Sequence, residues 1–273
     1  VLFRSAGIRF DKMAIKALGM LASGFSAAGL FLHLPLHNKD DFNFVFNMPF
    51  VTWVCVSVAI LMGHVLWRLS GAIKDNENPL GSQVYYTAGA LLLALGCMFE
   101  WYAHCDWQVA SGDVGGANFI MGSILIWIVL VVALLARPLP PAGLLVKAVG
   151  LLAALGGAVW TAYGMNKVYY QAFTVFANVP FGVAMLYAAM LLLAGWYLRR
   201  LNKNASRRSK VPSLTVLAGL ILIWVLLSEQ IYLYWDCGHR YGTIGDNWRF
   251  LAQMYISVSW AIYAAALLVL GFA

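Results

Sequence analysis

The chain has 273 residues, of which 62% are hydrophobic and only 11% are charged, and its mean hydropathy is +0.78. Soluble domains contain roughly 45–50% apolar and about 25% charged residues, so this composition excludes an ordinary cytosolic enzyme and a disordered chain. The net charge is +7. In so apolar a chain we interpret the basic excess by its position relative to a membrane, and we expect no nucleic-acid partner.

Eight apolar runs are long enough to cross about 30 Å of hydrocarbon as helices. Only helices and closed barrels satisfy the backbone in lipid, and these runs are too long and continuous for barrel strands. The sequence therefore predicts an all-α, polytopic membrane protein with about eight transmembrane helices. The predicted spans are residues 13–34, 48–69, 84–104, 119–137, 143–163, 180–201, 213–235 and 250–272.

The two ends of the chain suggest a fragment of a longer protein. Residues 1–5 back-translate to GTG CTC TTC CGA TCT, which is similar to the end of a sequencing adapter, so we expect an artefact within an N-terminal flank, residues 1–12. Residues 271–273 follow an apolar helix without a polar tail. We expect the remainder of a longer chain, or other membrane proteins, as partners.

The distribution of the 18 Lys and Arg residues predicts an orientation. Most of them lie in the N-terminal flank and in the even-numbered connections, above all in the run 199–210. The positive-inside rule assigns such segments to the cytoplasm. We therefore expect a bacterial inner-membrane protein with both ends of this chain in the cytoplasm and the lipid bilayer as its main partner.

The sequence also resembles itself at an offset of 131 residues. The segment 47–50, Asn-Met-Pro-Phe, corresponds to 178–181, Asn-Val-Pro-Phe, and Arg68 corresponds to Arg199. Further along, 88–100 resembles 218–229, with a slight drift in register. We expect two parallel four-helix repeats, residues 13–137 and 138–273, because an even number of spans gives both copies the same orientation.

Asn residues precede four of the predicted spans, namely Asn47, Asn118, Asn178 and Asn247. Asn is a favourable N-cap, and Pro in the first helical turn removes no helical hydrogen bond. We interpret these residues as helix caps and not as ligands.

Glu100 and Glu229 are the main candidates for a polar site within the spans. Both lie near the predicted outer ends of their helices, and carboxylates at membrane depth are costly and often functional. Asp106 and Asp236 follow them and complete the candidate site. The alternative is structural: the carboxylates reach the interface and bond to Trp, Tyr or backbone groups.

Cys105 and Cys237 lie in similar sequence contexts and are a candidate disulfide if the outer side is oxidising. Two alternatives stay open, a metal site that includes the nearby His104 and His239, and unpaired thiols. The sequence has no compact zinc motif, no mid-membrane Lys for retinal, no His pair for haem and no phosphate-binding loop. We therefore predict no catalytic residue, cofactor or metal.

The segments 217–235 and 257–272, together with 42–50, resemble an uncharacterised family of bacterial multi-pass membrane proteins, domain of unknown function 2339. The similar features are a helix that ends in Glu followed by aromatic residues, and a next helix in which Ser, Trp, Tyr and Gly-Phe follow one another at intervals. Helices that begin directly after an Asn are the third similar feature. The resemblance covers most of residues 13–272. It implies a membrane location, a longer parent chain and no established activity, cofactor or site residue.

Three functions are compatible with these features. The first is a transport-related protein with a path between the repeats, which Glu100 and Glu229 would line. The second is a non-catalytic scaffold or cell-envelope assembly protein, which the scarcity of polar residues in the spans favours. The third is a membrane enzyme that uses the acidic outer face, although no nucleophile and base are evident.

Overall fold

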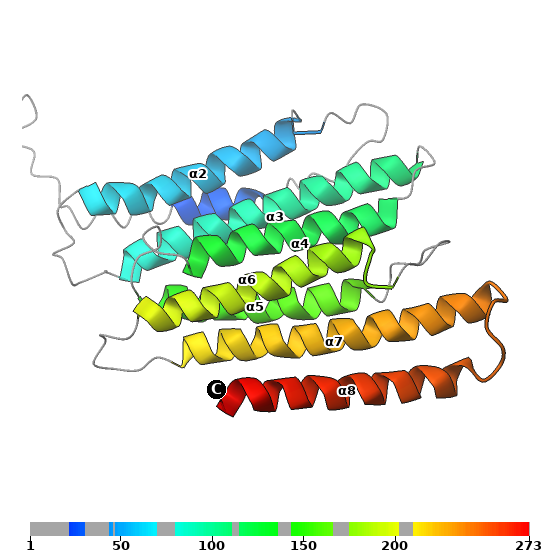
Figure 1. Ribbon diagram of the computed structural model, residues 1–273. Coiled ribbons are helices and arrows are strands. Elements are labelled where there is room, and N and C mark those ends of the chain that lie inside the picture. Colours follow the sequence, from blue (N-terminus) through cyan, green and yellow to red (C-terminus); the bar gives the residue numbers. More distant parts are fainter. Residues whose placement is uncertain are drawn as a thin grey trace, which may run out of the picture. The chain divides into compact units, whose positions relative to one another are not determined.

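The computed structural model confirms an all-α membrane architecture (Figure 1). It describes residues 22–30, 44–45, 47–69, 80–110, 115–135, 143–165, 175–201 and 210–272. Residues 22–30 are helical, and seven further helices in this part of the chain are long and apolar enough to cross a membrane. These are α2 (Met48–Leu69), α3 (Leu80–Ala110), α4 (Gly115–Leu135), α5 (Leu144–Met165), α6 (Val179–Leu201), α7 (Val211–Arg240) and α8 (Trp248–Phe272).

The positions of the predicted spans agree with these helices, but α3 and α7 are longer than predicted. They have 31 and 30 residues, and both continue into polar sequence at their carboxyl ends. In α7 the extension is supported by an ion pair one turn apart, with Arg240 Nη2 2.9 Å from Asp236 Oδ2. The predicted N-terminal flank, residues 1–12, and most of the first span lie outside the described residues.

The chain divides into two compact units after Glu100. The predicted boundary between the two copies of the sequence repeat, by contrast, lies between residues 137 and 138. The difference arises because α4, which belongs to the first predicted copy, packs against α5 and α6 of the second. The boundary of the compact units therefore differs from the boundary predicted for the sequence repeat.

Glycines bring α6 and α7 close together in the unit that begins at Trp101. A Cβ on Gly219 would lie 3.2 Å from the carbonyl oxygen of Ala188 and 3.0 Å from a methyl of Leu192, so a larger residue would require these neighbours to shift. In the unit that ends at Glu100, Gly89 has the corresponding role against Leu61, where an added Cβ would meet the side chain. Small residues thus set the approach of both helix pairs.

The helix α8 packs along α7 and is otherwise the most exposed helix described (Figure 1). Only 6% of its spanning segment is buried, and its exposed side chains include Ile262, Leu268 and Val269. Such a surface is compatible with hydrocarbon and not with water.

Candidate functional site

Glu100 is a buried carboxylate that accepts three hydrogen bonds from the residues around the start of α2. Its side chain is 2% exposed, and it lies six residues before the end of the spanning segment Leu80–Asp106. Glu100 Oε1 accepts the backbone amide of Val45 at 2.8 Å and the side-chain amide of Asn47 at 2.7 Å. The same Asn47 nitrogen lies 2.9 Å from Oε2. Within the described part of the chain no ion pair involves Glu100. The groups that donate to its carboxylate are a backbone amide and a side-chain amide, and both are neutral.

Asn47 has two functions at once, because its oxygen caps one helix while its nitrogen binds another. Asn47 Oδ1 accepts the amide of Phe50 at 2.8 Å, which satisfies a backbone group in the first turn of α2. The predicted cap is confirmed, and the capping contact orients the NH2 group toward Glu100. We call Val45, Asn47 and Glu100 the α2–α3 anchor.

Val45 adopts a left-handed backbone conformation, with φ of 71°. For a β-branched residue this conformation is unfavourable by about 1–3 kcal/mol and persists only where the surroundings require it. Here it accompanies a backbone amide that donates to Glu100. The strained residue and the buried carboxylate therefore belong to one arrangement.

A second anchor with the same geometry joins α6 and α7. Asn178 Nδ2 donates to Gln230 Oε1 at 2.8 Å, and Asn178 Oδ1 caps α6 by accepting the amide of Phe181 at 2.9 Å. The amide of Phe176, whose φ is 60°, reaches Gln230 Oε1 over 3.4 Å. We call Phe176, Asn178 and Gln230 the α6–α7 anchor.

The position that matches Glu100 is thus taken by Gln230 and not by its neighbour Glu229. The sequence comparison paired the two Glu residues by allowing a one-residue drift. The hydrogen bonds are consistent with one constant offset between α3 and α7. Gly89 corresponds to Gly219 and Glu100 to Gln230, in both cases 130 positions later. One anchor carries a carboxylate and the other the isosteric amide.

Both anchors lie far from the ends of their long helices. The helix α3 continues from Glu100 to Ala110 and α7 from Gln230 to Arg240, roughly 15 Å in each case at 1.5 Å per residue. Gln230 is completely buried. The polar contacts therefore join the start of α2 or α6 to a buried position within the longer helix, where an unsatisfied polar group is costly.

The remaining predicted site residues have separate surroundings. Glu229 is half-buried on α7, Asp236 is buried and paired with Arg240, and Asp106 is exposed near the end of α3. No group of three or more His, Cys, Asp or Glu among the described residues could hold a metal ion.

Cys105 and Cys237 are buried thiols, 3% and 5% exposed, and the structure does not contain the predicted disulfide. The prediction placed both residues in outer loops. They lie instead inside α3 and α7, where helix packing and not loop proximity determines the direction of a side chain.

Of the other two predicted Asn caps, Asn247 takes the cap position and Asn118 does not. Asn118 lies three residues inside α4, which begins at Gly115, and its backbone oxygen accepts the indole N–H of Trp101 at 3.1 Å. Asn247 directly precedes α8, and its backbone oxygen accepts the amide of Leu251 at 3.2 Å. Among the described residues, the side-chain cap bond is observed at Asn47 and Asn178.

Other polar side chains in the spans are also engaged in packing. His64 is buried and lies 2.7 Å, Nδ1 to Oγ, from the buried Ser82, as expected for a histidine without a ligand function. The indole N–H of Trp160 donates to Ser123 Oγ at 2.7 Å, which joins α5 to α4. The sequence did not reveal these pairs, because each joins residues of different helices.

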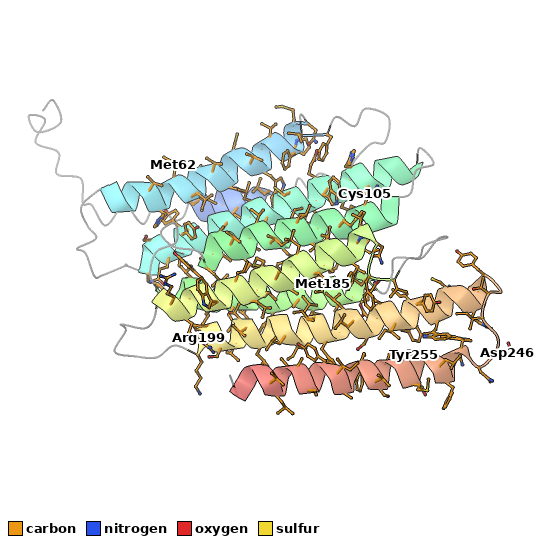
Figure 2. All side chains as sticks on the ribbon, in the orientation of Figure 1. Met62, Cys105, Met185, Arg199, Asp246 and Tyr255 are labelled. Carbon is orange, nitrogen blue, oxygen red and sulfur yellow. The ribbon has the colours of Figure 1, made fainter. Side chains whose placement is uncertain are left out.

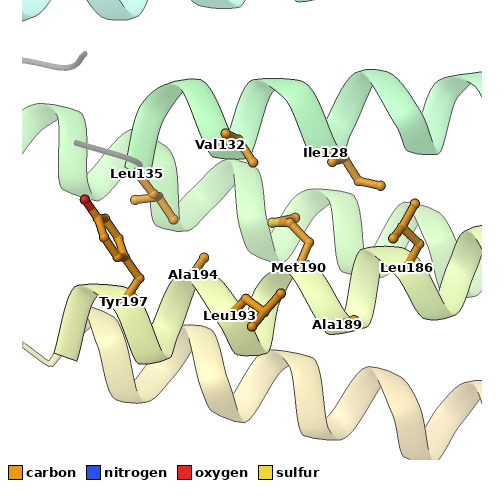
Figure 3. A pocket seen from close by; sticks show the side chains of 9 residues that line it. All are labelled: Ile128, Val132, Leu135, Leu186, Ala189, Met190, Leu193, Ala194 and Tyr197. Carbon is orange, nitrogen blue, oxygen red and sulfur yellow. The ribbon is translucent and has the colours of Figure 1, made fainter. Parts of the chain in front are cut away.

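An apolar groove of about 460 Å³ lies between α4 and α6 (Figure 3). Ile128, Val132 and Leu135 line it from α4, and side chains of α6 from Leu186 to Tyr197 line it from the other side. The groove has no charged lining residue. It does not resemble a path for a hydrophilic solute.

Comparison with family models, with curated proteins and with solved structures finds no match for this chain.

Proposed function

We propose that the chain is a non-catalytic scaffold or assembly protein of a bacterial inner membrane. The observation that carries this proposal is that each anchor closes on its own helix pair. A carboxylate that binds a transported ion or takes part in catalysis must be reachable by water or substrate. Glu100 is instead 2% exposed and hydrogen-bonded to the capping residue of α2. This geometry serves helix assembly.

The proposal includes an internal duplication of the α2–α3 and α6–α7 pairs. Supporting it are the shared caps Asn47 and Asn178, the shared positive φ of Val45 and Phe176, and the matching glycine contacts. The family resemblance to domain of unknown function 2339 belongs to the same proposal. It agrees with a membrane protein and assigns no activity.

The proposed orientation has both ends of this chain in the cytoplasm. Lys147, Arg199, Arg200 and Lys210 lie at the end of the second unit where α4 and α6 finish and α5 and α7 begin. Arg199 and Asp246 lie toward opposite ends of this unit (Figure 2). The positive-inside rule assigns the basic end to the cytoplasm. A cysteine at Thr243, in a background without other cysteines, should react with an impermeant maleimide from outside, and one at Lys210 should not.

The proposal is tested by mild solubilisation followed by light scattering and mass spectrometry. We expect a stoichiometric assembly, either of several copies or with another membrane protein, that exceeds the 30.0 kDa of one chain. A monodisperse monomer without a partner would contradict it.

A transport-related function is the second candidate, and the charge at Glu100 favours it. If Glu100 took part in transport, reconstituted vesicles would show a proton or cation flux that Glu100→Gln abolishes and Glu229→Gln leaves intact. The scaffold proposal expects no flux that depends on Glu100.

A further inference from the structure

We propose that the groove between α4 and α6 binds one acyl chain of an anionic phospholipid, with the lipid phosphate at Arg200. The groove lies in segments apolar enough to span a membrane, Asn118–Leu135 and Val179–Arg200. A cavity there is exposed to lipid chains. Its lining side chains are apolar apart from the hydroxyl of Tyr197 at one end (Figure 3).

The length of the groove corresponds to one leaflet. Along α6 it extends from Leu186 to Tyr197, roughly 16 Å at 1.5 Å per residue. Half of a typical hydrocarbon core is about 15 Å. An acyl chain lying along α6 would therefore have its headgroup near the residues that follow Tyr197.

The helical register places Arg200 on the groove side of α6. The lining residues Leu186, Met190, Leu193 and Tyr197 follow one another at intervals of three or four, and the next position in this series is Arg200. Arg200 is exposed, and its guanidinium lies 5.7 Å from the ring centre of Trp196. A guanidinium next to an interfacial Trp suits a phosphate at the headgroup level.

The binding test uses native mass spectrometry of the detergent-solubilised full chain with phosphatidylglycerol or phosphatidylcholine of identical acyl chains. One Lys or Arg at a membrane surface changes the affinity for an anionic lipid about fivefold. We therefore expect phosphatidylglycerol to bind about fivefold more tightly than phosphatidylcholine. Arg200→Gln should abolish the preference and leave phosphatidylcholine binding unchanged. Arg249→Gln is the matched control, because Arg249 also lies over a Trp ring, 5.3 Å from the centre of Trp248.

The groove itself is tested by Ala189→Phe, which fills it, against Ala265→Phe on the exposed surface of α8. Ala189→Phe should weaken binding of both lipids about fivefold or more, and Ala265→Phe should not. The smaller change Ala194→Leu gives the same test if Ala189→Phe alters the unfolding temperature. Undiminished binding in the folded groove variants, an equal loss in Ala265→Phe, or a preference that survives Arg200→Gln would overturn the proposal.

Discussion

Asn47 donates one side-chain amide to both carboxylate oxygens of Glu100, at 2.7 and 2.9 Å, across the interface of α2 and α3. The contact joins the residue directly before α2 to a residue ten positions before the end of α3. The same relationship holds between Asn178 and Gln230, where the acceptor is an amide. The two anchors therefore share one geometry and differ in the acceptor, a carboxyl group in one and an amide in the other, which permits a set of matched substitutions.

Exchange of the acceptors between the anchors should be tolerated. Glu100→Gln keeps an oxygen for Val45 and Asn47, as Gln230 does for Phe176 and Asn178. We expect the free energy of unfolding in detergent to fall by about 1–3 kcal/mol, because the new NH2 group takes the place of Oε2, 2.9 Å from the Asn47 nitrogen, and is left without an acceptor, as Gln230 Nε2 is. Gln230→Glu should likewise yield a folded protein, because the α2–α3 anchor already has a glutamate, Glu100, at the equivalent position.

Removal of the acceptor should be much more damaging than its exchange. Glu100→Ala leaves the buried side-chain amide of Asn47 and the amide of Val45 without their acceptor, and each unsatisfied donor costs about 1–3 kcal/mol. Thermal unfolding should show a clear loss for Glu100→Ala. Equal unfolding temperatures for Glu100→Ala and Glu100→Gln would show that the hydrogen bonds contribute nothing.

Glycine at Val45 should not destabilise the protein, in contrast to glycine within α2. Val45→Gly removes the cost of a positive φ, about 1–3 kcal/mol, and this offsets the entropy that glycine loses on folding. Val51→Gly, at an exposed position within α2, is the control and should cost about 1 kcal/mol. A larger loss at Val45 than at Val51 would show that its backbone conformation differs from the one described.

All four cysteines should react with an alkylating reagent after unfolding without reductant. Intact mass spectrometry of protein purified under air then gives one added group per cysteine. A mass that is lower by two groups, with a Cys105–Cys237 peptide after digestion, would instead establish the disulfide.

Hydropathy alone predicted the all-α fold and the helix positions, because a run of about 20 apolar residues has few alternatives in lipid. It did not predict the extra turns of α3 and α7, whose ends are polar and stabilised locally by contacts such as Asp236 with Arg240. The Asn caps were predicted at Asn47 and Asn178 because capping is a local property of sequence.

The partners of the caps were not predicted, because they lie on other helices. Val45 and Glu100 are 55 residues apart, and Phe176 and Gln230 are 54 apart. Pairing Glu100 with Glu229 followed residue type, whereas the structure follows position along the helix. An ungapped comparison of 88–100 with 218–230 would have indicated Gln230.

The most direct test of the anchors is a double-mutant cycle with Asn47→Asp, Glu100→Gln and their combination, and with Asn178→Asp in parallel. Asn47→Asp places a second carboxylate against buried Glu100, and an uncompensated buried charge costs about 3–5 kcal/mol. Asn178→Asp should cost no more than about 1–2 kcal/mol, because Gln230 can turn its NH2 group toward the new oxygen. We predict that Glu100→Gln restores most of the unfolding free energy lost in Asn47→Asp. Equal losses in the two Asp variants, without rescue by Glu100→Gln, would contradict the account.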